Sequence, residues 1–383
     1  MSKKIFLRTF GCQMNDRDSE FVMGLLLEKG YLKAESPEEA DVVLFNTCSV
    51  RKHAEDRAIS NMGAFLKKKR RHLKIYGIIG CSAQALKKGL FERLPDLDLI
   101  CGTGEIAKLP ELIVKAFQEK IIAVGNINRP LPELKSTYRQ GKKSTHVSIM
   151  RGCDNFCSYC VVPYVRGRER SRKAEDITSE IKDLVRRGIK DIMLLGQNVN
   201  SYKDKTCNFV ELLKLVNDVK GIEKITFFTS HPKDATVKLF EAIRDLDKVR
   251  KHLHLPLQSG SNRILKLMNR GYTREKYLDL VTRAKHIIPG LFLGTDMIVG
   301  FPSESDKDFN DTLDLVKKVR FDGAYIFKYS PRAGTGAAGM KDEVSEDTKK
   351  RRHRTLLDLQ REISKRKKHE KADRCHASHS LSR

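Results

Sequence analysis

The sequence lacks long apolar segments and has far fewer acidic than basic residues. No apolar run reaches the ~18 residues that a membrane-spanning helix needs, and the N-terminal stretch MSKKIFLRTFGCQ becomes polar too early for a signal peptide. With 74 Lys and Arg residues against 49 Asp and Glu residues, the formal net charge is +25. We therefore expect a cytoplasmic protein with no membrane partner and with a polyanion, nucleic acid first, as its ligand.

The chain has nine cysteines among 383 residues, which in a reducing compartment favours metal or redox chemistry over disulfides. The segment RGCDNFCSYC places Cys153, Cys157 and Cys160 in one loop, and the VVPYVRGRERSR that follows has neither Cys nor His. A closed zinc site needs four ligands. Three thiolates can hold a 4Fe-4S cluster and leave its fourth iron open. The spacing predicts such an open-site cluster, with a zinc-binding scaffold as the alternative.

Residues 1–125 alternate apolar runs at 4–10, 41–47, 74–80 and 97–101 with helical patterns at 16–29, 52–70, 84–93 and 105–118. This alternation predicts a Rossmann-like open parallel α/β sheet. Cys12, Cys48 and Cys81 each follow a predicted strand, at the sheet edge where ligands bind. They predict a second cluster with three protein ligands. Cys101 also ends a strand, and its position alone leaves its role open.

Residues 126–145 are polar and without pattern, which indicates a linker. Residues 146–340 hold predicted strands at 146–150, 190–195, 223–228, 251–255, 291–298 and 322–328, separated by helical segments. These repeats predict a partial (β/α)6 barrel, with the three-cysteine loop at the carboxyl end of its first strand. In residues 341–383 we expect a basic helix from about 346 to 368 and then an unstructured tail.

Several segments resemble the methylthiotransferase family of the radical S-adenosylmethionine (SAM) superfamily. FGCQMNDRDS, NTCSVRKHAE and IGCSAQ resemble its N-terminal domain, and SIMRGCDNFCSYCVVPYVRGRERSR its radical domain. LLGQNVNSY, HPKD, HLPLQSGSNRILKLMNRGYTREKY, DMIVGFPSE and AYIFKYSPRAGT also match. The resemblance covers roughly residues 4 to 365. Within the family, the sequences of these segments are most similar to those of the members that act on N(6)-dimethylallyladenosine beside the anticodon of tRNA.

The resemblance implies an enzyme with two 4Fe-4S clusters and SAM that replaces the hydrogen on carbon 2 of that adenine with a methylthio group. Its partners would be the anticodon stem-loop of tRNA and an electron donor such as a flavodoxin or ferredoxin, and nothing requires more than a monomer. The alternatives are a family member that acts on threonylcarbamoyladenosine in tRNA or on a ribosomal-protein aspartate, and a truncated, non-catalytic iron-sulfur protein that binds RNA.

Carried over residue by residue, the resemblance implies that Cys153, Cys157 and Cys160 hold the radical cluster and that Cys12, Cys48 and Cys81 hold the auxiliary cluster. Cys101 has no ligand counterpart and is assigned to packing. Tyr159 either shields the radical cluster or packs. The implied cofactor contacts are Gly196, Gln197, Gln258, Ser259, Ile298 and Gly300.

Four arginines beside the loop, Arg166, Arg168, Arg170 and Arg172, are candidates to bind RNA phosphates or the cofactor carboxylate, with a solvated loop as the alternative. In the family a small tRNA-binding TRAM domain follows the helix that corresponds to RTLLDLQREISK. The basic residues that end this chain do not resemble it, so the expectation is a chain without that domain, with doubtful tRNA affinity and intact cluster sites.

Overall fold

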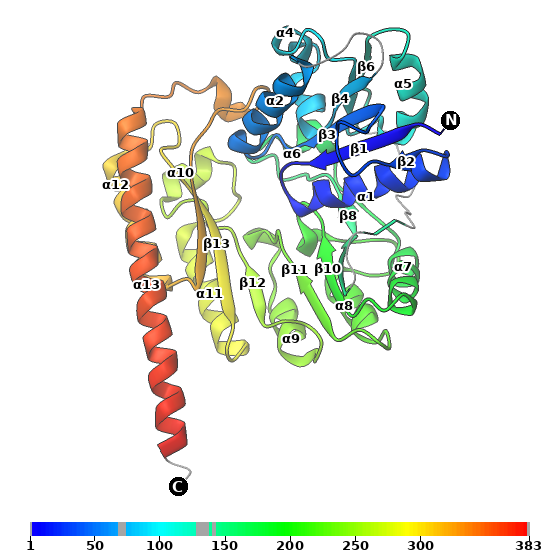
Figure 1. Cartoon of the computed structure of the whole chain (residues 1–383). Helices are drawn as coiled ribbons and strands as arrows, with labels where there is room; N and C mark the ends of the chain where they lie inside the picture. The colour runs from blue at the N-terminus through cyan, green and yellow to red at the C-terminus, as the bar shows by residue number, and fades with distance from the viewer. Residues whose placement is uncertain (1, 68–73, 128–137, 140–142, 381–383) are drawn as a thin grey trace. The chain divides into compact units, whose positions relative to one another are not determined.

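The computed structural model describes residues 2–67, 74–127, 138–139 and 143–380, with side chains through residue 370. The chain forms two compact units. The first unit comprises residues 1–154 and 160–197, and the second comprises residues 155–159 and 198–383. Strands alternate with helices in both units, as Figure 1 shows, which confirms the α/β class expected from the sequence.

A parallel sheet with the strand order β2-β1-β3-β4-β5-β6 is the centre of the first unit. Its strands are β1 (Lys4–Thr9), β2 (Leu32–Lys33), β3 (Val42–Thr47), β4 (Ile75–Gly80), β5 (Leu99–Gly102) and β6 (Ile121–Ala123). β3 and β4 are buried along their whole length. Both faces of these central strands are covered, which is why VVLFNT and IYGIIG are almost continuously apolar.

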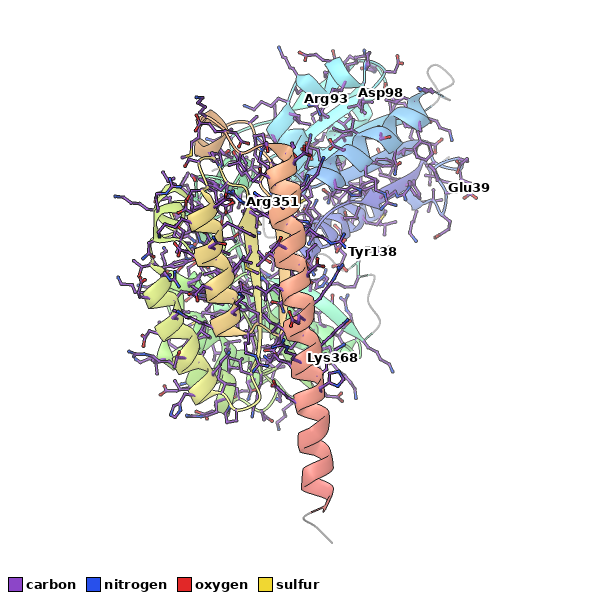
Figure 2. All side chains as sticks on the ribbon, turned by 90° about the vertical axis from the view of Figure 1, so that its left-hand side faces the viewer. Glu39, Arg93, Asp98, Tyr138, Arg351 and Lys368 are labelled. Carbon is purple, nitrogen blue, oxygen red and sulfur yellow. The ribbon has the colours of Figure 1, made fainter. Side chains whose placement is uncertain are left out.

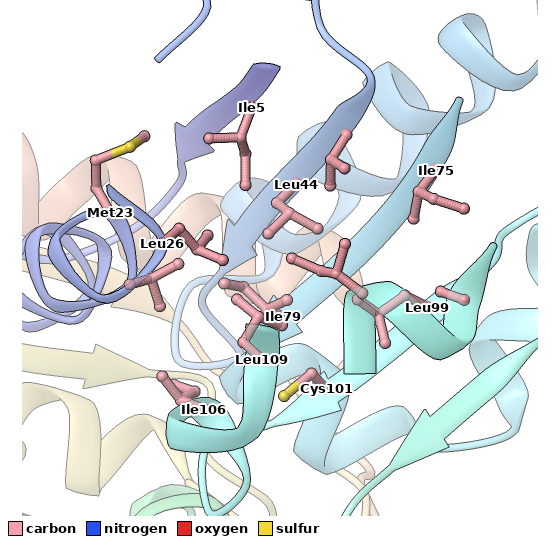
Figure 3. Packing of buried hydrophobic residues seen from close by; sticks show 14 of the residues in the cluster. Ile5, Met23, Leu26, Leu44, Ile75, Ile79, Leu99, Cys101, Ile106 and Leu109 are labelled. Atoms are coloured by element: carbon pink, nitrogen blue, oxygen red, sulfur yellow. The ribbon is translucent and has the colours of Figure 1, made fainter. Parts of the chain in front are cut away.

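Helices cover the two faces of this sheet. On one face α1 (Gln13–Glu28) and α5 (Leu109–Ala116) pack on alternate strand residues, and Figure 3 shows Leu26 and Leu109 converging on Leu44 and Ile79. On the other face α2 (Lys52–Leu66), α3 (Cys81–Leu86) and α4 (Gly89–Arg93) build a second apolar cluster. Burial of apolar surface contributes roughly 25 cal/mol per Å² to the free energy of folding. The two clusters therefore stabilise the sheet and, with it, the order of neighbouring strand ends.

The structure corrects several predicted boundaries in this unit. The short strands β2 and β6 were not predicted, because two or three residues carry too little periodic signal. The helix predicted over 84–93 is two helices, since α3 begins at Cys81 and ends before Lys87, which has a φ of +51°. The helix predicted over 105–118 divides into the 3-10 turn η1 (Ile106–Lys108) and α5, whose first turn contains Pro110.

The first unit continues past the predicted linker. Residues 128–137 and 140–142 of that linker lie outside the described residues, and β7 (Ser144–Ser148) begins inside it. β7 pairs in parallel with β10 (Asp191–Leu195). Between them lie α6 (Val162–Arg166), α7 (Ala174–Arg186) and the antiparallel pair β8 (Met150–Arg151) and β9 (Arg170–Ser171). The boundary between the compact units lies after residue 197, whereas the predicted domains divide at residues 126–145.

The second unit contains β11 (Lys224–Phe227) and the parallel sheet β12-β13-β14. The sheet strands are β12 (His252–His254), β13 (Phe292–Val299) and β14 (Gly323–Lys328). The helices and 3-10 turns are η2 (Val199–Ser201), α8 (Phe209–Asn217), η3 (Pro232–Asp234), α9 (Val237–Asp245), α10 (Asn262–Leu267), α11 (Arg274–Ile287), α12 (Asp306–Val319) and η4 (Gly336–Gly339). Every strand predicted over 146–328 is thus present, with boundaries shifted by at most two residues.

Sequence-encoded caps start two of these helices. Asn208 and Glu211 form a capping box at α8, and Ser305 and Asp308 form one at α12. In each box, the side chain of the first residue accepts a hydrogen bond from the backbone N–H of the third helical residue. The side chain of that third residue accepts one from the backbone N–H of the first residue. The caps therefore set where the helices begin after the preceding loops.

The C-terminal helix α13 (Glu346–Ser380) is longer than predicted. The expected unstructured tail after residue 368 is wrong as far as Ser380, because the helix continues through it. Helix α13 packs against β14, and Figure 2 shows Arg351 and Lys368 along its length. Leu356 and Ile363 are buried, and Gln360 Nε2 donates to Phe321 O at 3.0 Å. Within the described part of the chain, no helix has the length and apolar character needed to cross a membrane.

Candidate active site

Cys12, Cys48 and Cys81 lie at the carboxyl ends of neighbouring strands in the first unit. Cys12 precedes α1, Cys48 follows β3, and Cys81 is the first residue of α3, directly after β4. Because β1, β3 and β4 are adjacent in the sheet, the thiols share one edge, as the sequence predicted. Gly11, at φ +122°, makes room for them, since a Cβ there would lie 2.2 Å from Cys48 Cβ. No other residue fits at position 11 without moving Cys48.

The thiols of this triad are electrostatically linked. A hydrogen bond from the Cys48 thiol, together with the charge of Arg166, lowers the pKa of Cys12 to about 6, although burial acts in the opposite direction. Burial raises the pKa of Cys81, and Arg166 opposes that rise. The guanidinium therefore favours the thiolate form, which is the form that binds metal.

Arg166 is itself held in the interior of the first unit. Its Nη2 donates to Asp18 Oδ2 at 2.8 Å and to Asn15 Oδ1 at 3.0 Å. The Arg166 and Asp18 side chains are only 4% and 1% exposed. Arg151 lies 3.9 Å from the same carboxylate and donates from Nη2 to Thr103 O. Buried charges need such partners, so the network fixes two cations close to the cysteine edge.

Cys101 has a different environment from these three. It is fully buried in the apolar cluster on the α1 and α5 face, where Figure 3 shows it near Ile79, Leu109 and Ile106. Burial raises its pKa well above the ordinary value. The packing role expected for Cys101 therefore agrees with its surroundings, because a buried, protonated thiol behaves as a small apolar side chain.

The three-cysteine loop begins with a tight backbone approach in the first unit. Gly152 has a φ of +81°, and a Cβ there would lie 2.0 Å from Arg168 O. Its N–H donates to Gln197 Oε1 at 2.6 Å, while the Cys153 N–H donates to Gly167 O at 3.2 Å. Gln197 directly follows Gly196 and β10, so the strand end predicted to contact the cofactor supports the loop.

The middle of the loop, residues 155–159, is held within the second unit by the turn after α10. Asn269 Nδ2 donates to Asn155 O at 3.2 Å and to Phe156 O at 3.1 Å. The Ser158 N–H and hydroxyl donate to Met268 O and Leu267 O, and Ser158 O accepts from the Ala337 N–H at 2.7 Å. These bonds supply the partners that an irregular loop cannot provide for itself, so they set the path of the loop around Cys157.

Arg270 connects that turn to a cysteine of the loop. Its Nη1 lies 3.3 Å from Cys157 Sγ and 3.2 Å from Tyr159 Oη, its Nε donates to Tyr272 Oη at 3.0 Å, and its Nη2 donates to Pro256 O at 3.0 Å. Arg270 is only 4% exposed. A buried guanidinium with fixed partners is a rigid donor toward Cys157. Tyr159 thus contacts Arg270 and packs against the Phe301 cluster.

A buried polar cluster surrounds His231 in the second unit. The His231 ring lies 5.8 Å from the Tyr272 ring. Burial, then the charges of Arg270 and Lys233, lower the pKa of His231 to about 2, so the ring is neutral. Its Nδ1 accepts from the Lys233 N–H at 3.2 Å, which assigns the proton to Nε2. Among the described residues Nε2 has no hydrogen-bond partner.

Other buried polar atoms of the second unit also lack a partner within the described residues: Asn198 Oδ1, Ser230 Oγ and Gln258 Oε1. Buried polar groups are normally satisfied, so these atoms indicate a place for a polar ligand. Gln258 is the predicted cofactor contact among them. Its φ is +68°, and its backbone is bound to β13 through Asp296 O and the Ile298 N–H.

The remaining predicted cofactor contacts differ in accessibility. Ile298 lies in β13 and Gly300 follows it, at the strand end expected. Gly300 has a φ of +68°, and its N–H donates to Glu304 Oε2 at 2.7 Å. Ser259 is fully buried, and its hydroxyl lies 3.5 Å from Thr312 Oγ1 on α12. The surroundings of Ser259 therefore favour a supporting role over a direct cofactor contact.

The four arginines proposed to bind phosphates are not equivalent. Arg166 is buried on Asp18, and Arg172 bonds Glu180 Oε2 and Ser148 O, both at 2.7 Å. Arg170 donates to Ile127 O. Only Arg168 has a largely exposed side chain, at 61%. The surroundings of Arg166 and Arg172 therefore favour a structural role over phosphate binding, because each guanidinium group is already paired with an internal carboxylate.

Sequence reasoning missed Asp18, Arg270 and His231. Each lies in a segment that carries the family resemblance: FGCQMNDRDS, LMNRGYT and HPKD. The signal was a charged or polar residue within a matched motif, and only the structure shows that all three are buried. Their contacts depend on residues far away in the sequence, which no local pattern encodes.

No group of three or more His, Cys, Asp or Glu side chains in the described residues is arranged to hold a metal ion. In a 4Fe-4S cluster each thiolate binds a different iron, so its ligands do not converge on one point. The donor chemistry fits a cluster in both triads, because each consists of free cysteines that are buried or half-buried. Arg166 near one triad and Arg270 at the other add positive groups beside the sulfurs.

Family models match both parts of the chain. The model described as the radical SAM superfamily matches residues 147–316, which include Cys153, Cys157 and Cys160. The model described as uncharacterized protein family UPF0004 matches residues 4–102, which include Cys12 and Cys48 as well as Cys81. Each triad thus lies within one matched family region.

Solved structures support the fold. The radical S-adenosylmethionine methyltransferase TsrM from Kitasatospora setae, solved with cobalamin and a [4Fe-4S] cluster, is similar with a TM-score of 0.65 and 13% identity over 88% of this chain and 74% of that chain. The cobalamin-dependent S-adenosylmethionine radical enzyme OxsB has a TM-score of 0.60 and 14% identity over 95% of this chain and 56% of that one. At these identities the likeness concerns the fold alone.

Curated relatives are much more similar in sequence. The tRNA-2-methylthio-N(6)-dimethylallyladenosine synthase of Thermoanaerobacter pseudethanolicus is 48% identical over 94% of this chain and 78% of its own length. The enzymes with the same name from Caldicellulosiruptor saccharolyticus and Clostridium botulinum (strain Hall) are 49% and 47% identical, over 96% and 95% of this chain and 79% and 83% of their own lengths. The chain belongs to this methylthiotransferase family of the radical SAM superfamily.

Proposed function

We propose that this chain methylthiolates tRNA, replacing the hydrogen on carbon 2 of N(6)-dimethylallyladenosine beside the anticodon with a methylthio group. The observation that carries the proposal is the presence of both cysteine triads, one in each matched family region, in a chain 48% identical to enzymes named for this product. A high positive charge of +25 suits an RNA substrate.

Two 4Fe-4S clusters and SAM are the cofactors in this proposal. Cys153, Cys157 and Cys160 would hold the radical cluster, and Cys12, Cys48 and Cys81 would hold the auxiliary cluster. When bound, the radical cluster and SAM supply the chemistry that removes the hydrogen from carbon 2, and the auxiliary cluster supplies the sulfur site.

The residues of the chain bind and orient these groups. Arg270 positions Cys157 and Tyr159, while Gly152 and Gln197 hold the start of the loop. The neutral His231 offers its Nε2–H, and Gln258 offers Oε1, to polar groups of SAM. Burial of these side chains keeps water away from a reactive site.

The proposed setting is the cytoplasm, with the protein acting as a monomer on the anticodon stem-loop. Electrons would come from a small redox protein such as a flavodoxin or ferredoxin. A base beside the anticodon is in a single-stranded loop, so it can leave the stack and enter a pocket.

Nucleoside mass spectrometry tests the function directly. The chain is expressed in cells that lack their own methylthiotransferase, beside Cys153→Ala and Cys48→Ala variants and a Cys101→Ala control. We expect methylthio-dimethylallyladenosine with the wild type and Cys101→Ala, and only its precursor with the other two. A methylthiolated threonylcarbamoyladenosine, or precursor alone despite soluble, iron-loaded wild-type protein, contradicts the proposal.

A further inference from the structure

One face of the β12-β13-β14 sheet carries a group of rings that the cofactor site does not use. The group, called here the aromatic face, contains residues on these strands or just after β11: Phe228, His252, His254, Phe292, Tyr325 and Phe327. Tyr325 is 64% exposed, and Phe292 and Phe327 are each 41% exposed. Exposed rings of this size are unusual when they gather on one surface.

Strand register places these rings side by side. His252 is opposite Phe292, and their ring centroids are 4.7 Å apart. His254 lies 6.2 Å from Tyr325, and Phe228 lies 5.1 Å from His252. Alternation along a strand brings Tyr325 and Phe327 onto the same face. The rings therefore form a continuous surface across the strands.

Glycines let the rings lie close to the sheet. Gly294 and Gly323 are paired across β13 and β14. A Cβ at Gly294 would meet His254 Nδ1 at 2.9 Å, and one at Gly323 would meet the Phe292 ring at 3.4 Å. A side chain at Gly294 would displace the His254 ring, so the close approach of that ring to the sheet depends on glycine at this position.

The opposite face of the same sheet is covered. Ile326, between the two exposed rings of β14, is buried, and its carbonyl bonds the His353 ring of α13 at 3.0 Å. Leu293 and Met297 of β13 are fully buried as well. The exposed rings are therefore not part of the packing between the sheet and its helices.

The aromatic face is continuous with predicted cofactor contacts. Phe327 is paired with Ile298, which lies on the same face of the sheet. The carboxyl ends of these strands, where Gly300 follows β13, are where the chemistry of such folds takes place. A molecule lying on the rings would thus reach the reaction centre.

The chemistry of the face favours nucleobases as the occupant. Rings alternate with histidines and one carboxylate, Asp296, which His254 Nε2 contacts at 3.2 Å. Few aliphatic side chains are present, unlike the core of a protein-docking patch. Exposed Arg250 and Lys251 precede β12 and can neutralise phosphates. Unpaired bases bind by stacking on rings beside such cations.

We propose that the aromatic face is a stacking platform for unpaired bases of the tRNA anticodon loop, with Tyr325 and Phe327 as its main contacts. The inference rests on the proposed function, since it names the surface that receives that substrate. It assigns a binding role to residues outside both cysteine triads.

Fluorescence anisotropy with the whole 383-residue chain tests the platform. The probes are a labelled RNA hairpin with an anticodon-type loop and a labelled RNA duplex of equal length. We expect Tyr325→Ala and Phe327→Ala each to weaken hairpin binding by about fivefold to one hundredfold, the loss of one stacked base, and to leave duplex binding unchanged. Tyr325→Phe should bind as the wild type does. Leu215→Ala, an exposed apolar residue of α8, is the matched control.

Two further measurements make the result decisive. The salt dependence of hairpin binding should keep the wild-type slope in the alanine variants, because stacking releases no counterions. Phe327→Leu keeps apolar area and removes the ring, so wild-type hairpin affinity in this variant would overturn stacking and point to an apolar protein-docking surface. Unchanged hairpin affinity in both alanine variants would also overturn the proposal. Melting temperatures identify any variant that fails to fold.

The outcomes separate this inference from the proposed function. If the wild type makes the methylthio nucleoside while the alanine variants bind the hairpin normally, the function holds and the platform fails. If the wild type makes no product while the variants lose hairpin affinity, the platform holds and the assigned product fails.

Discussion

Arg166 Nη2 and Asp18 Oδ2 form an ion pair of 2.8 Å in which both side chains are almost completely buried. The residues are 148 positions apart, one in α1 just after Cys12 and the other at the end of α6 just after the three-cysteine loop. The ion pair therefore holds α1, which follows Cys12, against α6, which follows Cys160, within the first unit.

Removing one partner of this pair should destabilise the protein strongly. Arg166→Met leaves the Asp18 carboxylate buried without its main cation, which typically costs about 3–5 kcal/mol. The control is Arg168→Met, because Arg168 and Asp154 are 61% and 45% exposed, and such surface pairs contribute about 0–1 kcal/mol. Urea unfolding followed by circular dichroism measures both. Equal losses in the two variants would show that Arg166 is not held as described.

Gly152→Ala should prevent the cluster proposed for the three-cysteine loop from being retained. The new Cβ would lie 2.0 Å from Arg168 O at a φ of +81°, so the loop start must move. The matched control, Gly188→Ala, has a φ of +85° with no atom within 4 Å, and should cost only the backbone strain of about 1 kcal/mol. After anaerobic reconstitution we expect iron in Gly152→Ala to fall by about half, because one of the two proposed clusters is lost. Full iron content in this variant contradicts the prediction.

Arg270→Gln should lower the reduction potential of the radical cluster proposed at Cys157. Arg270 donates toward Cys157 Sγ, and a positive donor at a ligand sulfur stabilises the more negative, reduced cluster. Arg270→Lys keeps the charge without the fixed fork and should fall between wild type and Arg270→Gln. Potentiometric titration followed by electron paramagnetic resonance gives the potentials, with exposed Arg283→Gln as control. An unchanged potential together with a lower melting temperature would leave Arg270 a purely structural role.

The neutral His231 predicts a pH dependence of stability. Burial and the charges of Arg270 and Lys233 lower the pKa of His231 from 6.5 to about 2. Between these two pH values the imidazole is protonated in the unfolded chain and neutral in the folded chain. The contribution of neutral His231 to the free energy of unfolding is complete above pH 6.5 and is lost as the pH falls toward 2. At pH 5 the loss is about 2 kcal/mol.

The measurement is the urea midpoint at pH 7 and pH 5. His231→Asn should remove part of the decrease between the two pH values, whereas replacing the exposed His286 of α11 should not. If His231→Asn shows the full wild-type decrease, the histidine is not held neutral in the folded state.

The parts of the fold that local patterns encode were predictable. Apolar runs between helical stretches gave the strands, and the position of each cysteine at a strand end followed from them, which placed Cys12, Cys48 and Cys81 on one edge. Cys101 could not be separated from them by position. Its burial among Ile79 and Leu109 distinguishes it, and that depends on how α5 folds back on the sheet.

Charged and aromatic side chains were harder to interpret because their environment depends on distant partners. The run of arginines after the loop looked solvent-facing, and Asp18 and Glu180 turn two of them inward. The sequence around Tyr325 and Phe327 predicts an ordinary apolar strand. Only the pairing of β14 with β13 and the exposure of the two rings show that this face of the sheet is uncovered. Helix α13 extends to Ser380 although its sequence there has no apolar repeat.

Helix α13 also shapes the loop that follows β13. Lys349 Cγ would lie 2.3 Å from a Cβ at Gly300, and Arg352 Nη1 bonds the Glu304 carboxylate at 2.8 Å. Shortened expression products or nonsense variants that stop before this helix would keep every cysteine of both triads and still leave that loop without its support. Such products would also uncover β14 and lose the buried contacts of Leu356 and Ile363, so their loss of activity would be a folding defect and not a loss of cluster ligands.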